Sequence, residues 1–239
     1  MSEFFTINLP DEYINIMNEI KIDKNMDPFR KLEKSGFSSI DENIYNIIYE
    51  SIKDVSNHNS DKLAKKCAII IDKILQLCIT KLSQNMNINK YHKLVWLRYG
   101  TATYDFDIPR WHCDGNYEIN NISIVDPPAN QKKIIVSLIG QGTLIAKCSN
   151  SHNKELMENT ITLEKKYPRY DKNHKLNTKN AKLIQKKLSK CLDLCTVHQL
   201  DNFEGVIYNI GNVFNCCVHS EPKFDKPRLF LGLVLSEIQ

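Results

Sequence analysis

The residues best suited to chemistry are a histidine and an aspartate two positions apart, in the sequence Pro109-Arg-Trp-His-Cys-Asp-Gly115. On an extended strand, residues i and i+2 point to the same face, so His112 and Asp114 can reach one metal ion together. An imidazole and a carboxylate suit iron(II), and a second histidine would complete a set that leaves three positions open for reactants. Trp111 alternates to the opposite side and is expected in the core. Alone, the pair is a weak signal, because an HxD sequence also arises by chance.

A second histidine near the C-terminus is the candidate for the third ligand. His219 stands in the sequence VHSEP, after the strand-like run GVIYNIG (205–211). Arg228 then opens the apolar run 228–235, where a guanidinium can bind a carboxylate through two parallel hydrogen bonds. The other histidines in this half of the chain have weaker sequence contexts: His152, His174 and His198.

Short runs rich in β-branched and aromatic residues surround these candidate ligands. From Tyr91 onward they alternate with Gly, Pro, Asn and Asp, a pattern typical of a sandwich or jelly roll of short strands. The runs 133–140 and 228–235 are almost continuously apolar, which predicts strands covered on both faces. The expected strands are 93–100, 101–106, 133–140, 143–148, 205–211 and 228–235.

Two other parts of the chain are predicted to be helical. Residues 1–90 read as a helical segment, with one helix at 39–55 and another that Ser60 caps and that continues to about Leu82. Residues 149–200 read as a basic insertion with one helix, at 178–194. From 147 to 190 the chain has twelve Lys/Arg and four Asp/Glu, a net charge of +8 in a chain whose total is +4. Such a block attracts phosphates or acidic partners, although a solvated, lysine-rich surface is the simpler interpretation.

The order HxD, distal histidine and arginine on the next strand resembles the 2-oxoglutarate- and iron(II)-dependent oxygenase superfamily. The resemblance covers residues 91–239 and assigns no subfamily. Within it, GQGTLI (140–145) is similar to the glycine-containing turn and strand found between the metal motif and the distal histidine. The resemblance implies an α+β protein in which a jelly-roll (double-stranded β-helix) core, residues 91–239, carries the N-terminal helices of 1–90 packed on it.

The same resemblance implies roles for individual residues. His112, Asp114 and His219 would be the iron(II) ligands and the catalytic residues, and Arg228 would bind the distal carboxylate of 2-oxoglutarate. Many members have Ser or Thr two residues after that arginine, where this chain has Phe230. A hydroxyl from elsewhere is then expected to assist Arg228, and the candidates are Tyr99, Tyr104 and Thr143. The implied reaction hydroxylates or demethylates an unidentified substrate, with succinate and carbon dioxide as co-products.

Two other classes of function stay open. Cys191, Cys195 and His198, with Cys216 and Cys217, would suit a zinc-stabilised nucleic-acid-binding protein that uses the basic insertion. However, Cys191 and Cys195 have helical spacing and are more simply a buried stripe. The other class is a non-catalytic jelly-roll binding module. Because the insertion has few aromatic residues for base stacking, a protein side chain or a small metabolite is favoured over nucleic acid as the substrate.

The N-terminal sequence bears on the cellular setting. The start, MSEFFTINLPDEY, lacks the basic stretch and long apolar run of a signal peptide, and the most apolar window, 67–80, contains Asp72 and Lys73. These features predict a cytoplasmic protein with no membrane partner. In that setting most of the eight cysteines are expected to be buried thiols. The sequence does not indicate an oligomeric state.

Overall fold

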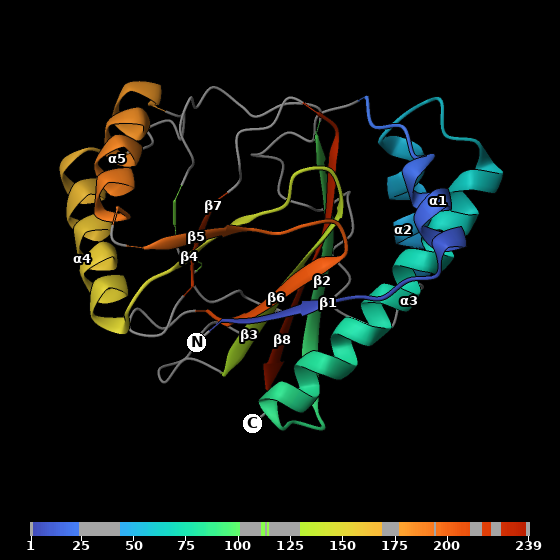
Figure 1. Cartoon of the computed structure of the whole chain (residues 1–239), viewed down its shortest axis with the longest axis horizontal. Coiled ribbons are helices and arrows are strands. Elements are labelled where there is room, and N and C mark those ends of the chain that lie inside the picture. Colours follow the sequence, from blue (N-terminus) through green and yellow to red (C-terminus); the bar gives the residue numbers. More distant parts are fainter. Residues whose placement is uncertain are drawn as a thin grey trace.

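Helices and antiparallel strands together give this chain an α+β fold (Figure 1). The structure, a computed structural model, describes residues 2–23, 44–100, 111, 112, 114, 130–168, 177–193, 195–210, 217–220 and 226–237. The helices are α1 (Asp11–Asn18), α2 (Ile44–Asp54), α3 (Asp61–Met86), α4 (Asn150–Lys166) and α5 (Thr178–Cys191). The strands are β1 (Glu3–Thr6), β2 (Tyr91–Gly100), β3 (Gln131–Ile139), β4 (Leu144–Lys147), β5 (Thr196–Gln199), β6 (Glu204–Asn209), β7 (Val218–Ser220) and β8 (Arg228–Glu237).

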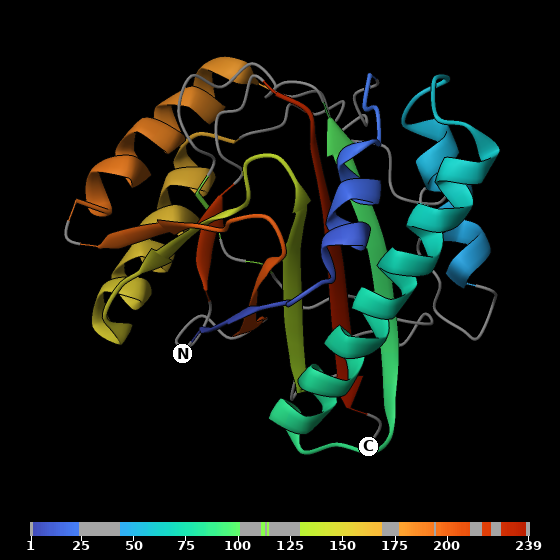
Figure 2. The ribbon, with the colours of Figure 1, turned by 45° about the vertical axis from the view of Figure 1, so that its right-hand side comes forward.

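The strands form two sheets. Five strands make the larger sheet in the order β1-β6-β3-β8-β2, and three make the smaller sheet in the order β5-β4-β7. The pairings between neighbouring strands are antiparallel. Helices α1 to α3 lie against the larger sheet, and α4 and α5 lie beyond the smaller one (Figures 1 and 2).

Alternation along β8 separates two apolar cores. Leu229, Leu231, Leu233 and Leu235 join the cluster that the larger sheet makes with helices α1 to α3. Phe230 and Val234 point the other way and join a second cluster, which includes Ile145 of β4 in the smaller sheet. This second cluster therefore lies between the two sheets, where a strand-borne side chain can face both of them.

A third cluster attaches the basic insertion to the smaller sheet. Ala146 of β4 and Val218 of β7 pack with Ile184 and Leu188 of α5, and Trp111 completes the group. Trp111 is buried, as predicted. Helix α5 thus belongs to the same apolar cluster as Trp111, the residue before His112.

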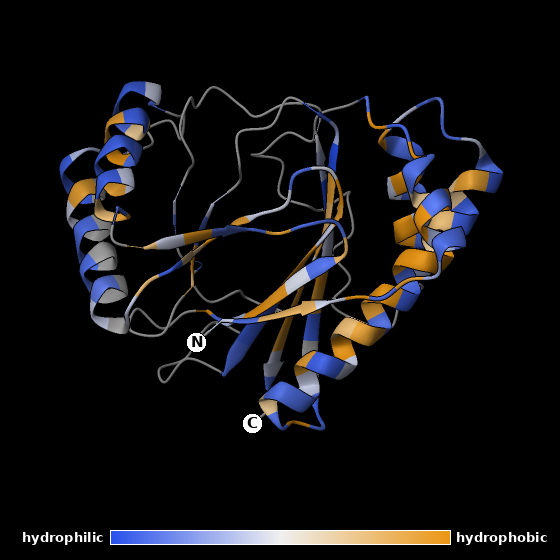
Figure 3. Ribbon diagram, viewed as in Figure 1, coloured by the Kyte–Doolittle hydropathy of each residue, from blue (hydrophilic) through white to orange (hydrophobic). Residues whose placement is uncertain are grey.

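Helix α3 confirms the prediction of a long helix capped by Ser60. The Ser60 hydroxyl accepts a hydrogen bond from the backbone N–H of Leu63, and the helix ends at Asn87, which has a left-handed conformation with φ of 55°. Most of its apolar residues are buried in the cluster shared with the larger sheet and helices α1 and α2, whereas Ile69 and Leu77 are exposed. Hydrophobic and hydrophilic residues alternate around the helix in Figure 3. Helix α2 begins at Ile44, and the earlier part of the helix predicted at 39–55 lies outside the described residues.

Most of the predicted strands are confirmed, and β3 and β8 are buried along nearly their whole length. The strand expected at 101–106 lies outside the described residues. Two expectations are wrong in part. Residues 1–90 are not wholly helical, because β1 pairs with β6 as an edge strand of the larger sheet. Phe4 and Phe5 point to opposite faces of this strand, and each packs against a different apolar core. The insertion holds two helices rather than one, and the additional helix, α4, is capped by Ser149.

The prediction of buried thiols is confirmed at three of the described cysteines, Cys67, Cys78 and Cys217. Cys191 is also outside any disulfide, but it is only partly buried. Burial raises the pKa of both Cys67 and Cys78 to about 12, so these two are unreactive core residues. The prediction is wrong for Cys148 and Cys195, which form a disulfide between the end of β4 and the start of β5. Of the helices in the described ranges, none is both long enough and apolar enough to cross a bilayer.

Candidate metal centre

Backbone pairing brings the two candidate histidine ligands together. The N–H of His112 donates to the carbonyl of His219 and the N–H of His219 donates to the carbonyl of His112, both at 2.9 Å. The two residues therefore stand directly opposite each other in an antiparallel bridge at the open side of β7. Side chains of such a pair lie on the same face. Their ring centroids are 4.3 Å apart.

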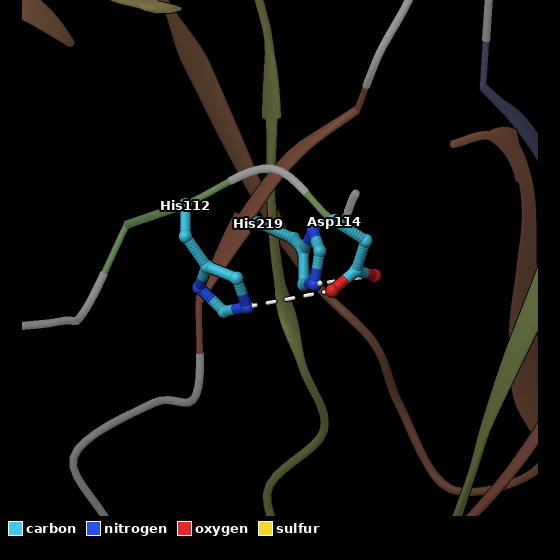
Figure 4. A group of neighbouring side chains, drawn as sticks. All are labelled: His112, Asp114 and His219. Atoms are coloured by element: carbon cyan, nitrogen blue, oxygen red, sulfur yellow. Dashed lines mark ion pairs between the residues drawn. The ribbon is translucent and has the colours of Figure 1, made fainter. Parts of the chain in front are cut away.

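Asp114 points to the same place (Figure 4). Its Oδ1 lies 3.8 Å from Nε2 of His112, and its Oδ2 lies 3.4 Å from Nε2 of His219. One nitrogen from each ring and one carboxylate oxygen all lie within 4.8 Å of one another. The spacing of two residues between His112 and Asp114 thus gives the convergence that an extended segment predicts.

The two histidines differ in exposure. The side chain of His219 is 5% exposed and that of Asp114 is 11% exposed, whereas that of His112 is 38% exposed. His219 stands on β7, next to Ile145 of β4, and faces the space between the sheets. The site therefore opens to solvent on the side of His112.

His219 is held in the form that binds a metal. Burial lowers the pKa of His219 to about 3, so its ring is neutral at physiological pH. Its Nδ1 lies 3.1 Å from the carbonyl oxygen of Cys217. A carbonyl only accepts, so Nδ1 carries the proton, and the lone pair of Nε2 is directed toward Asp114.

Asp114 is held as a carboxylate. Burial acts to raise the pKa of Asp114, but the positive charge of Lys133 and the adjacent His219 and His112 together more than offset it and hold the pKa well below its usual range. A metal requires deprotonated ligands. The site thus presents one anionic oxygen and a neutral imidazole without any change of protonation at neutral pH.

These residues fit a divalent transition metal. Two ligands about 2.1 Å from a metal in adjacent octahedral positions are roughly 3 Å apart. The closest pair here, Nε2 of His219 and Oδ2 of Asp114, is separated by 3.4 Å, and the whole set lies within 4.8 Å. Two imidazoles and one carboxylate on one side of the ion are the ligand set of non-haem iron(II) oxygenases, which leaves the remaining positions open.

Two residues that the sequence did not reveal contact Asp114. The ammonium of Lys133 lies 2.6 Å from Oδ2, and the hydroxyl of Tyr208 donates to the same oxygen at 3.2 Å. Both come from the larger sheet, where Lys133 of β3 stands opposite Tyr208 of β6. The only sequence signal was a lysine at the start of a buried strand, and a lysine in the core is almost always paired.

Arg228 is buried between the sheets and is held by Thr143. Its Nη2 donates to Oγ1 of Thr143 at 2.8 Å, and its guanidinium lies 4.5 Å from the ring centroid of Phe230. Both Arg228 and Thr143 are almost completely buried. Arg98, on the neighbouring β2, lies 5.7 Å from the same ring and was also not identified from the sequence.

The other two hydroxyl candidates are not placed beside Arg228. The hydroxyl of Tyr99 donates to Asp54 of α2 at 2.9 Å, and Tyr99 packs with the helix-side cluster. It stands opposite Leu229, which faces the helices, whereas Arg228 faces the other way. Tyr104 lies outside the described residues.

The alternative zinc site is not formed by the residues described. The sulfur of Cys195 is bonded to Cys148, so it is not available as a thiolate ligand. His198 instead pairs with Glu204 at 2.8 Å. Cys216 lies outside the described residues. Among the described residues, His112, Asp114 and His219 make up the one group of three or more His, Cys, Asp or Glu side chains close enough to hold a metal.

Comparison with known proteins gives distant structural neighbours. No protein-family profile matches the sequence, and no curated protein matches it. Among solved structures, the chain is similar to the viral collagen prolyl hydroxylase vCPH from Paramecium bursaria Chlorella virus-1, with a TM-score of 0.44 and 9% identity over 100% of this chain and 90% of that one. It is also similar to a Pseudomonas putida prolyl-4-hydroxylase, with a TM-score of 0.38 and 11% identity over 99% and 84% of the two chains.

A third neighbour is AAD-2 in complex with Mn(II) and N-oxalylglycine, with a TM-score of 0.27 and 10% identity over 54% of this chain and 64% of that one. These similarities are too distant to assign a role to any residue. The chemistry of this chain follows from its own geometry.

Proposed function

We propose that this protein is an Fe(II)- and 2-oxoglutarate-dependent dioxygenase. The observation that supports it best is the convergence of His112, Asp114 and His219 within 4.8 Å on the inner face of the smaller sheet. Two imidazoles and one carboxylate favour Fe(II) in an open site, because thiolates are absent from this group. We further propose that the two facing sheets are the halves of a double-stranded β-helix, with His112 in an additional edge segment beside β7.

Each residue then has a defined task. His112, Asp114 and His219 would hold Fe(II), and Arg228 with Thr143 would bind the distal carboxylate of 2-oxoglutarate. The fixed, buried guanidinium suits a carboxylate because its planar donors bind two oxygens at once. Thr143 would supply the hydroxyl that Phe230 cannot, and its hydrogen bond to Nη2 of Arg228 supports that role.

When bound, Fe(II) and 2-oxoglutarate would use dioxygen to oxidise a substrate C–H bond, with one oxygen atom going to succinate and the other to the substrate, and carbon dioxide as the further co-product. The chain's own part is to orient the reactants and limit access of water. Asp114 and His219 are the more buried ligands, so substrate would approach from the side of the more exposed His112. The substrate remains a prediction: a protein side chain or a small metabolite, with nucleic acid less favoured.

The test is anaerobic addition of Fe(II) and 2-oxoglutarate to the purified protein. A weak visible absorption band should develop only when both are present, and admission of air should yield succinate. His198→Ala serves as the control, because His198 lies on β5 of the same sheet and pairs with Glu204. A protein that binds neither Fe(II) nor 2-oxoglutarate would be a non-catalytic binding module, and the proposal would be wrong.

A further inference from the structure

Lys133 has an unusual position for a lysine. Its side chain is 6% exposed, and its ammonium lies 2.6 Å from Oδ2 of Asp114 and 4.9 Å from the ring centroid of Trp96. A charged lysine is rarely buried unless it is paired. The Lys133–Asp114 ion pair is therefore an integral part of the site, on the side of Asp114 that faces the larger sheet.

The ammonium has little freedom to move away. Lys133 belongs to β3, between Tyr208 of β6 and Val234 of β8. The Trp96 ring covers Gly232 so closely that a Cβ on that glycine would lie 2.1 Å from the ring. The ring is thus fixed against the sheet, and Lys133 is fixed between this ring and Asp114.

A metal and the Lys133 ammonium would share one carboxylate. Lys133 neutralises Asp114 when no metal is bound, which stabilises a buried charge. A divalent ion on the same group is repelled by the ammonium, and at such short range in a protein interior this repulsion exceeds the strength of one hydrogen bond. Tyr208 donates to the same oxygen but is neutral, so it orients Asp114 without repelling the metal.

We propose that Lys133 is the resident counter-ion of Asp114: it stabilises the metal-free protein and weakens divalent metal binding, whereas Tyr208 strengthens binding by orienting the carboxylate. This inference rests on the proposed function insofar as the site must be one that binds a divalent metal. The two groups that donate to Oδ2 should therefore change metal affinity in opposite directions. If Lys133 and Tyr208 only positioned Asp114, removal of either one would weaken metal binding.

The experiment measures Mn²⁺ binding by isothermal titration, with no other ligand, in Lys133→Met, Tyr208→Phe and a matched control, Lys132→Met. Lys132 is the adjacent residue, and its amine instead contacts Asn85 at the protein surface. Lys133→Met should bind Mn²⁺ at least about tenfold more tightly, and Tyr208→Phe about tenfold more weakly. Lys132→Met should bind as the wild type does.

Thermal unfolding supplies a second readout. Metal-free Lys133→Met should unfold at a temperature roughly 10 °C lower than the wild type, because it leaves Asp114 as a buried charge without its ammonium partner. Saturating Mn²⁺ should remove most of that difference. Lys133→Gln, which keeps a neutral donor, should behave in the same way and serves if Lys133→Met does not fold.

Unchanged or weaker Mn²⁺ binding by the Lys133 variants would overturn the inference. Failure of both variants to fold even with Mn²⁺ would also overturn it, since the metal must be able to replace the ammonium. Failure of the proposed function has a different signature: the wild type would bind no Mn²⁺. Binding gained only in Lys133→Met would then still support the role of Lys133.

Discussion

The two faces of the larger sheet are made by the same strands but carry different kinds of side chain. On β3, Ile134, Val136 and Leu138 belong to the apolar cluster shared with helices α1 to α3. The alternate residues face the smaller sheet, and there Lys133 pairs with Asp114. On β8 the leucines face the helices, and Arg228 faces the space between the sheets.

The two-residue period of the strands places different kinds of side chain on the two faces. The helix-facing side is apolar, whereas the inner face combines a second apolar cluster with two buried polar contacts, Lys133 with Asp114 and Arg228 with Thr143. Substitutions on the helix-facing side should therefore change unfolding and leave ligand binding unchanged. Substitutions on the inner face should change ligand binding, with or without a change in unfolding.

The largest expected effect is the loss of a metal ligand on the inner face. His219→Ala removes a donor whose orientation the Cys217 carbonyl fixes, and should weaken Mn²⁺ binding by more than about a hundredfold, beyond the usual effect of losing an outer-shell partner. Titration calorimetry measures this change. His198→Ala is the matched control, and equal losses in both variants would remove the assignment of His219.

Arg228→Ala tests the second inner-face group. Removal of one partner from a buried carboxylate–guanidinium contact should lower affinity for 2-oxoglutarate about thirtyfold or more, with Mn²⁺ affinity unchanged. Equilibrium dialysis of 2-oxoglutarate in the presence of Mn²⁺ checks it. Arg98→Ala, at a half-buried arginine on the other side of Phe230, should change the affinity by less than about threefold. Unchanged affinity in Arg228→Ala would show that the co-substrate carboxylate binds elsewhere.

Leu231→Ala tests the helix-facing side. Leu231 is fully buried between β8 and the helices, so its truncation leaves a cavity and should lower the free energy of unfolding by about 2–5 kcal/mol. Urea denaturation measures that loss. The folded variant should bind Mn²⁺ with wild-type affinity, and a parallel loss of metal binding would break the proposed separation of the two faces.

Acid should destabilise the metal-free protein through the inner face. His219 has a pKa of about 3 in the folded chain, below its ordinary 6.5, so the unfolded chain takes up the proton first as pH falls. The contribution of the neutral His219 ring to the free energy of unfolding is fully present above about pH 6.5 and is lost as the pH falls toward 3. The free energy of unfolding should fall by up to about 1.4 kcal/mol per pH unit because of this group. Asp114, whose pKa is also lowered, adds loss below its ordinary 3.8.

Urea denaturation with a chelator across pH 4 to 7 measures this slope. His219→Gln should flatten the profile over that interval by about one proton. Identical profiles for the wild type and the variant would mean that His219 is not buried as a neutral ring.

Loss of the disulfide should affect stability and leave metal binding nearly unchanged. Cys195→Ser breaks the bond to Cys148 and should destabilise the fold by about 2–4 kcal/mol where the disulfide is formed, with Mn²⁺ and Zn²⁺ affinities within about twofold of wild type. Metal titration of the reduced and oxidised proteins checks it. Zinc lost together with Cys195 would revive the cysteine-based site.

The sequence predicted those features that short-range patterns determine. The HxD spacing, the buried runs at β3 and β8 and the cap at Ser60 each depend on neighbouring residues. Strand β7 was not predicted, since three residues acquire their structure only by pairing with β4 and His112. Helix α4 was missed because its sequence is mostly polar.

The inner-face partners of Asp114 and Arg228 could not be predicted from the sequence, because they depend on pairing between distant strands. Gln131, Lys132 and Lys133 are consecutive polar residues, and only the pairing of β3 with β6 and β8 decides which amine faces Asp114. The partnership of Cys148 with Cys195 likewise depends on β4 lying beside β5. Thr143 was one of three hydroxyl candidates, and the fold is what sets it beside Arg228.

Anomalous diffraction from crystals grown with Mn²⁺ can show whether His112, Asp114 and His219 bind one metal ion together. A single strong peak is expected within about 2.3 Å of Nε2 of both histidines and of one oxygen of Asp114. A peak beside the cysteines, or none between these three side chains at saturating Mn²⁺, would contradict it.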